Sequence, residues 1–166
     1  MDLASVVALA EILGTIAVVV SLVYVAIQIR QSTRATKLAT GQNLSQDYRE
    51  AIAPLHGDSE LARIYLHAMQ DVESLTGEDR FRAYVFTQCL LRTIENAYYQ
   101  YRNGAVDEYV WEAFVSNLKF LKDTSISRAF WQDRQHIFSE EFREFYNEVR
   151  GADPRVTFAP YANDET

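Results

Sequence analysis

An uncharged apolar segment near the amino terminus, from Ile12 to Ile29, is the feature that most constrains this chain. Its eighteen residues would span roughly 27 Å as a helix, close to the hydrocarbon thickness of a bilayer, about 30 Å. A cleaved signal peptide has a basic start and a cleavage site of small residues. This chain instead begins MDLAS, and its apolar segment continues without such a site into IQIRQ. A buried helix of a water-soluble protein is the other alternative, but a helix that is apolar on every face normally needs a much larger protein around it. We therefore predict a transmembrane anchor over residues 1–30.

The charges that flank this segment predict its orientation. Glu11 precedes it, Arg30, Arg34 and Lys37 follow it, and no Lys or Arg comes before Arg30. Basic residues accumulate on the cytoplasmic side of membrane helices. We therefore expect an inner (plasma) membrane protein with its amino terminus outside and its carboxyl-terminal domain in the cytoplasm.

Small residues recur along one face of the segment. Ala10, Gly14, Ala17 and Ser21 are spaced by four, three and four residues, so they share a helical stripe. Such stripes let two membrane helices approach closely, which would make this one a helix–helix seam. The alternative is that Gly, Ala and Ser are simply common in membrane helices.

The remaining chain predicts an all-α fold, in which the anchor is followed by a small helical bundle. No proline occurs before Pro54, so a juxtamembrane helix is expected to continue the anchor over residues 31–53, with Gly41 as its weak point and a break at Pro54. A cytoplasmic bundle is then expected over residues 54–151 and an irregular tail over 152–166.

Helix-capping residues divide the bundle into four or five helices. A carboxylate or hydroxyl residue stands at each expected start, and a glycine ends the longest helix: Asp58, Thr76, Asp107, Ser125 and Ser139 for the starts, and Gly104 for the end.

The charge balance limits the partners of the bundle. The net charge is -7, and the part from Arg30 onward is still acidic. Nucleic-acid surfaces are clustered Lys and Arg, so no nucleic acid is expected as a partner. The partners that we expect are the lipid bilayer and either a second copy of this chain or another membrane protein.

Polar residues form a stripe on the longest predicted helix, at spacings that place them on one face. A solvated face is one interpretation, and a partly buried network that fixes helix register or binds a polar ligand is the other. If Glu95 is buried, its carboxylate requires Arg92 or Arg102 as a partner. We predict that Glu95 is at least half buried and hydrogen-bonded. The polar stripe consists of Gln88, Arg92, Glu95, Asn96, Tyr99 and Arg102.

The order of three segments, IQIRQSTR, RTIENAYYQYRNG and DEYVWEAF, resembles an uncharacterised family of small bacterial single-pass membrane-anchored helical proteins. In that family the helix equivalent to TIENAYYQYRNG typically carries an acidic–amide pair, which is Glu95 and Asn96 here. The resemblance implies the fold and the location, and no activity.

No other pattern indicates chemistry. Asp133 and His136 form a single carboxylate–histidine pair, short of the paired Glu-x-x-His motifs that a di-iron bundle needs, so neither a metal nor a cofactor is expected. The lone Cys89 is expected to be a small core residue. Aromatic residues crowd the carboxyl-terminal segments, and any that the core cannot bury would mark a contact surface.

The sequence therefore predicts a membrane-anchored helical module that makes protein contacts, as a self-associating protein or as an accessory subunit of a larger membrane complex. The alternative is an oligomeric pore with Glu11 and Gln28 as polar rings at its two mouths. An enzyme ranks third, because the sequence shows no nucleophile–base pair or phosphate loop.

Overall fold

The computed structural model of the chain describes residues 2–152, and for residue 3 and residues 5–10 it describes the helical backbone alone. The described residues are all-helical, as expected, with six α-helices, two short 3₁₀ turns and no strand. The helices are α1 (Leu3–Gly57), α2 (Ser59–Asp71), α3 (Gly77–Arg102), α4 (Glu108–Lys122), α5 (Ser125–Arg134) and α6 (Glu140–Glu148), and the 3₁₀ turns are η1 (Val72–Ser74) and η2 (Gln135–Ile137).

The first compact unit extends to Ala39 and consists of the amino-terminal part of α1. From Ile12 to Ile29 every side chain is exposed, including bulky ones such as Val20 (61% exposed) and Leu22 (64%). By length and composition α1 is able to cross a membrane. The described part of the chain contains no other helix of this kind.

The second compact unit begins at Thr40, earlier than the expected start of the bundle at residue 54. The last turns of α1 belong to it, because Leu44 is 2% exposed and Tyr48, Ile52 and Leu55 pack against the same core.

Two expected interruptions of α1 do not occur. Gly41 is buried within the helix, and a Cβ atom placed there would lie 3.5 Å from Val110 of α4, so this glycine marks a close approach between helices. Pro54 lies inside the helix, which ends only at Gly57. A proline costs the helix one backbone hydrogen bond, and here the packing of the surrounding turns on the core compensates for it.

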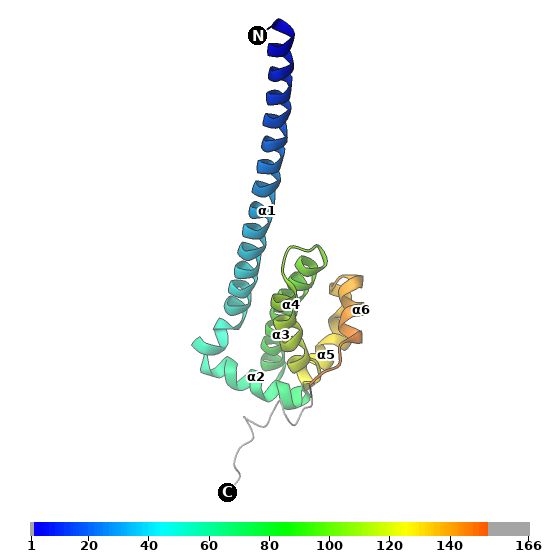
Figure 1. Cartoon of the computed structure of the whole chain (residues 1–166). Helices are drawn as coiled ribbons and strands as arrows, with labels where there is room; N and C mark the ends of the chain where they lie inside the picture. Colours follow the sequence, from blue (N-terminus) through cyan, green and yellow to red (C-terminus); the bar gives the residue numbers. More distant parts are fainter. Residues whose placement is uncertain (1, 153–166) are drawn as a thin grey trace. The chain divides into compact units, whose positions relative to one another are not determined.

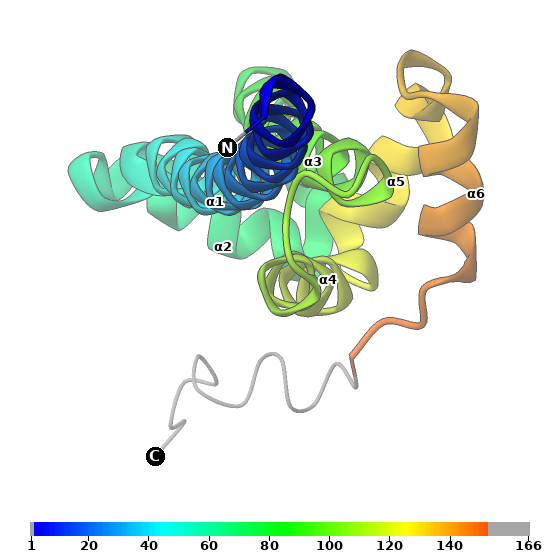
Figure 2. The same ribbon diagram turned by 45° about the horizontal axis from the view of Figure 1, so that its top comes forward.

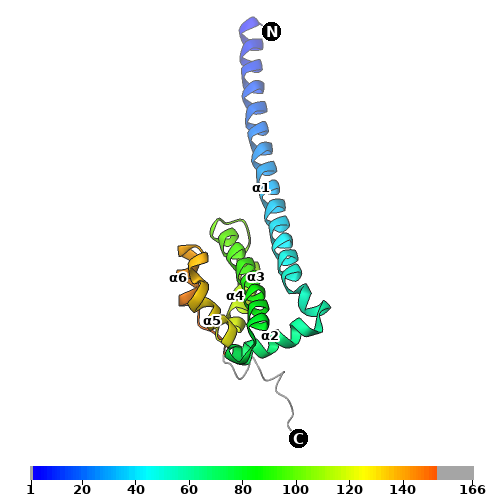
Figure 3. The same ribbon diagram turned by 180° about the vertical axis from the view of Figure 1, so that it is seen from behind.

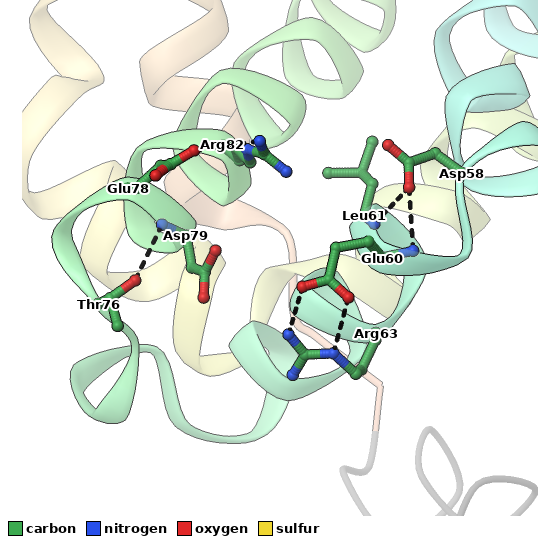
Figure 4. Close-up of polar contacts among 8 residues, drawn as sticks. All are labelled: Asp58, Glu60, Leu61, Arg63, Thr76, Glu78, Asp79 and Arg82. Atoms are coloured by element: carbon green, nitrogen blue, oxygen red, sulfur yellow. Dashed lines mark hydrogen bonds and ion pairs between the residues drawn. The ribbon is translucent and has the colours of Figure 1, made fainter.

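Asp58, Thr76 and Ser139 cap their helices as the sequence predicts, and the first two caps are drawn in Figure 4. Asp107 also directly precedes its helix, α4, but its side chain makes no capping hydrogen bond. The Asp58 carboxylate accepts hydrogen bonds from the backbone N–H groups of Glu60 and Leu61 at 2.9 and 3.1 Å, and the Thr76 hydroxyl accepts one from Asp79. Ser139 caps α6 in the same way. These bonds satisfy donors that have no partner within their helix.

One predicted cap is wrong by a residue. Thr124, and not Ser125, caps α5, through a hydrogen bond that its hydroxyl accepts from the Ser127 N–H. Ser125 is the first residue of the helix, and its hydroxyl accepts a hydrogen bond from the Val72 N–H. Either of two adjacent hydroxyl residues can cap a helix. Here the Ser125 hydroxyl is engaged by η1, and Thr124 takes the cap position.

The end of α3 is a Schellman motif. Gly104 has a φ of 68°, its N–H donates to the Tyr101 carbonyl, and the Ala105 N–H donates to the Gln100 carbonyl, both at 2.9 Å. A left-handed residue without a Cβ atom is favoured at this position, which confirms the expected helix end at Gly104.

Helix α3 is the central element of the second unit. Its buried face includes Phe86, Leu90, Ile94 and Ala97, and it contacts α2, α4 and α5. Figures 1 and 3 show α2 running crosswise to α3 and α4. Figures 1 and 2 show α6 at one edge of this unit, beside α5.

Aromatic side chains fill the core around α5 and α6. Trp131 and Tyr146 stack with ring centroids 3.6 Å apart, and Phe130 and Phe142 are fully buried. The core therefore takes up most of the crowded carboxyl-terminal aromatics.

Lys122 secures the end of α6. Its ammonium group donates hydrogen bonds to the carbonyl oxygens of Tyr146 at 2.5 Å and Asn147 at 3.2 Å, and to that of Val149. Carbonyls at the carboxyl end of a helix have no partner within it, so a cation placed there stabilises the helix. The chain then continues to Ala152, whose N–H donates to the Lys119 carbonyl. The rest of the expected irregular tail, residues 153–166, lies outside the described residues.

Candidate functional site

The polar stripe lies on α3 as expected, but its members differ in burial. Gln88 and Glu95 are half-buried, whereas Arg92, Asn96, Tyr99 and Arg102 are exposed. The Glu95 side chain is only 15% exposed. Both interpretations of the stripe therefore hold in part, because a half-buried carboxylate lies within a largely solvated face.

Glu95 and Arg92 together hold the connection between α5 and α6. One oxygen of Glu95, Oε2, pairs with Nη1 of Arg92 at 2.6 Å, and the other, Oε1, accepts a hydrogen bond from the Ser139 N–H at 2.8 Å. Arg92 also donates to the Ile137 carbonyl at 2.7 Å, and its guanidinium lies 4.7 Å from the centroid of the Phe138 ring. The prediction that Glu95 is at least half buried and hydrogen-bonded is confirmed. Of the two expected partners, Arg92 and Arg102, it is Arg92 that pairs with Glu95, and the connection between α5 and α6 covers the carboxylate.

The contact between Glu95 and Ser139 completes the start of α6. In a capping box, a Glu or Gln three residues after the cap returns a hydrogen bond to the cap residue's own N–H. Here Phe142 occupies that position and cannot accept such a bond. Glu95 supplies the missing acceptor from another helix, which places its negative charge at the positive end of the α6 dipole.

A polar hollow of about 520 Å³ adjoins this clamp. One guanidinium, Arg102, and two carboxylates, Glu95 and Glu141, lie in its wall together with Tyr98, Tyr99, Asn103 and Ser139. Arg102 donates a hydrogen bond to the Tyr98 hydroxyl at 3.2 Å. The Ser139 hydroxyl accepts the Phe142 N–H in its role as a cap, so it has a structural use. This wall offers hydrogen bonds to a polar ligand but no nucleophile paired with a base.

The seam residues lie in the first unit. Gly14, Ala17 and Ser21 are exposed, no atom lies within 4 Å of a Cβ atom placed on Gly14, and the Ser21 hydroxyl donates to the Ala17 carbonyl at 2.8 Å. The Ala10 side chain is outside the described residues. The stripe is thus open to a partner helix, and whether it meets one stays a prediction.

Cys89 is exposed, so its expected place in the core is wrong. It shares a face of α3 with the exposed Phe81 and Val85, at spacings of four residues, and all three line a groove of about 450 Å³ that also involves Pro54 and Leu61. The periodic pattern predicts which residues share a face, but it does not predict whether another helix covers that face.

Asp133 has a structural partner, since it accepts a hydrogen bond from the Tyr84 hydroxyl at 2.9 Å. Among the residues that the structure describes, no three His, Cys, Asp or Glu side chains are grouped closely enough to hold a metal ion.

Comparison of the chain with models of protein families, with curated proteins and with solved structures found no significant match. The family resemblance inferred from the sequence therefore stays a prediction.

Proposed function

We propose that the chain is a single-pass membrane protein of the inner (plasma) membrane, whose helical second unit makes protein contacts in the cytoplasm. Its contacts are with further copies of the chain or with a larger membrane complex, of which it is an accessory subunit. The proposal rests on three observations.

The exposed apolar surface of α1 is the observation that carries the proposal. Ile12, Val20 and Leu22 are each more than half exposed, and so are many of the large side chains between them. Burying one such side chain away from water is worth about 1.5–3 kcal/mol, so a continuous apolar surface of this length favours a hydrocarbon environment.

Polar side chains in this segment make their hydrogen bonds within the helix. The Thr15 hydroxyl donates to the Glu11 carbonyl at 2.8 Å, and Gln28 Nε2 donates to the Tyr24 hydroxyl at 3.0 Å. Hydrocarbon offers no hydrogen bonds, so internal satisfaction lowers the cost of transfer into a membrane. The hydrogen bond of Gln28 also weakens the pore alternative, in which Gln28 forms a polar ring at one mouth. It occupies an amide donor of Gln28 within its own helix.

The polar stripe supports an interaction module over an enzyme. Its most buried member, Glu95, is engaged by Arg92 and by the Ser139 N–H, which is a role in packing. The orientation is proposed from Arg30, Arg34 and Lys37, which follow the apolar segment.

Two measurements on the full chain test this proposal. Membranes are washed with alkaline carbonate, and the protein is expected to remain with them, since a protein that only adheres is released. The native mass after mild detergent extraction is then expected to be at least twice that of one chain, or to include a second protein. Release by carbonate would refute the anchor, and a lone monomer would refute the interaction module.

A further inference from the structure

An apolar hollow lies within the second unit, between the last turns of α1, helix α2 and helix α4. Its volume is about 380 Å³, within the range of about 300–1,000 Å³ that is typical of small-molecule sites. Aliphatic and aromatic side chains dominate its wall, among them Ile52, Leu55, Leu66, Met69, Phe120 and Leu121.

The polar groups of this hollow carry no charge. Tyr65 is 4% exposed, and its hydroxyl makes no hydrogen bond to any described residue. Burial raises the pKa of Tyr65 to about 12, so the phenol stays neutral. No Lys, Arg, Asp or Glu is among the described residues that line the hollow. An ionised group placed there would lose its water without gaining a counter-ion, so the hollow suits a hydrocarbon chain.

A second, smaller hollow of about 270 Å³ adjoins the first, because Tyr48 and Asn117 line both. Ser45 and Arg49 line only the second. Arg49 is exposed and forms no ion pair within the described part of the chain. A guanidinium and an amide at the end of an apolar hollow can bind a carboxylate or a phosphate.

We propose that these adjoining hollows bind a single-chain amphiphile with an anionic head, its hydrocarbon chain among Ile52, Leu66 and Met69 and its head beside Arg49 and Asn117. The shared chemistry is an alkyl chain that ends in a carboxylate or a phosphate. A free fatty acid and a lysophospholipid both have it.

The test uses the full chain in phosphatidylcholine nanodiscs and two photoreactive probes of equal length, a ten-carbon fatty acid and a ten-carbon fatty alcohol that each carry a diazirine. Mass spectrometry then locates the labelled residues. Labelling by the acid is expected in α2 and α4, at residues that line the larger hollow. Unlabelled decanoate and a ten-carbon lysophosphatidylglycerol are added as competitors, and the stronger competitor identifies the source.

Two variants separate the head from the tail. Arg49→Gln is expected to lower labelling by the acid about tenfold and to leave labelling by the alcohol within about twofold, because only the acid uses the guanidinium. Arg134→Gln, at an exposed arginine of α5 outside both hollows, is the matched control and is expected to leave both unchanged. Ala62→Phe, which fills the larger hollow, is expected to lower labelling by both probes.

Several results would overturn the proposal. They are labelling confined to residues 11–29 of α1, equal labelling of wild type and Arg49→Gln by the acid, and failure of both competitors. Because Arg49 is exposed, its variant is expected to fold, and tryptophan emission from Trp111 and Trp131 verifies that it does.

Discussion

Replacing Glu95 tests the clamp between α3 and the start of α6. Glu95→Ala removes the acceptor of the Ser139 N–H, a hydrogen bond of 2.8 Å to a charged group, and the ion pair with Arg92. A hydrogen bond to a charged group contributes about 1.5–3 kcal/mol, and an exposed ion pair about 0.2–1 kcal/mol. Water reaches part of the site, since Arg92 is 45% exposed, so we place the total near the lower end. We therefore expect a loss of about 2 kcal/mol.

The loss is measurable by thermal unfolding of the full chain in nanodiscs. Both tryptophans of the sequence, Trp111 and Trp131, lie in the second unit, so their emission reports on this unit alone. A loss of about 2 kcal/mol corresponds to a fall in Tm of roughly 8 °C for a unit of this size. Glu95→Gln is expected to cost about half as much, because the amide oxygen still accepts the Ser139 N–H.

Asn96→Ala is the matched control, since Asn96 is the exposed neighbour of Glu95, and a change within about 0.5 kcal/mol is expected. Amide exchange adds a local measurement, in which Glu95→Ala speeds exchange in α6 more than in α2. If Glu95→Ala melts at the same temperature as the wild type, Glu95 contributes nothing to the stability of the clamp.

Three further substitutions have expected outcomes. Gly14→Leu should lower the yield of cross-linked dimers in membranes by pushing the seam helices apart, whereas Val19→Leu should not; equal yields would show that the stripe faces lipid. Tyr65→Phe should raise the free energy of unfolding by about 1 kcal/mol, because it removes a buried hydroxyl without a partner, and lower stability in denaturant titrations would contradict this. Because the raised pKa of Tyr65 makes the wild type lose stability between about pH 10 and 12, the variant should lose less over that window. Lys122→Met should cost about 2 kcal/mol by leaving carbonyls of α6 unpaired, and unchanged melting would exclude this role.

Local chemistry made much of the fold predictable. Asp58, Thr76 and Ser139 cap their helices, and Gly104 ends α3, because each effect depends on residues only a few positions away.

Features that depend on distant residues were not predictable in this way. Glu95 accepts a hydrogen bond from Ser139, which is 44 positions away in the sequence, so no local spacing pattern predicts this contact. Gly41 was expected to weaken α1, but its structural role is to permit the close approach of Val110 from α4. Cysteine is a residue type that is often buried, and the exposure of Cys89 depends on the groove that remains between α3 and residues of α1 and α2. The apolar hollow likewise exists only once α1, α2 and α4 are packed.

The membrane anchor and the cytoplasmic position of the second unit are measured most directly through Cys89, the only cysteine of the chain, which is exposed in the second unit. Membranes are washed with alkaline carbonate, prepared as inside-out and as right-side-out vesicles, and treated with a membrane-impermeant maleimide. We expect the washed membranes to retain the protein and Cys89 to react in the inside-out vesicles alone. Labelling of Cys89 in right-side-out vesicles, or washed membranes that hold no protein, would contradict this expectation.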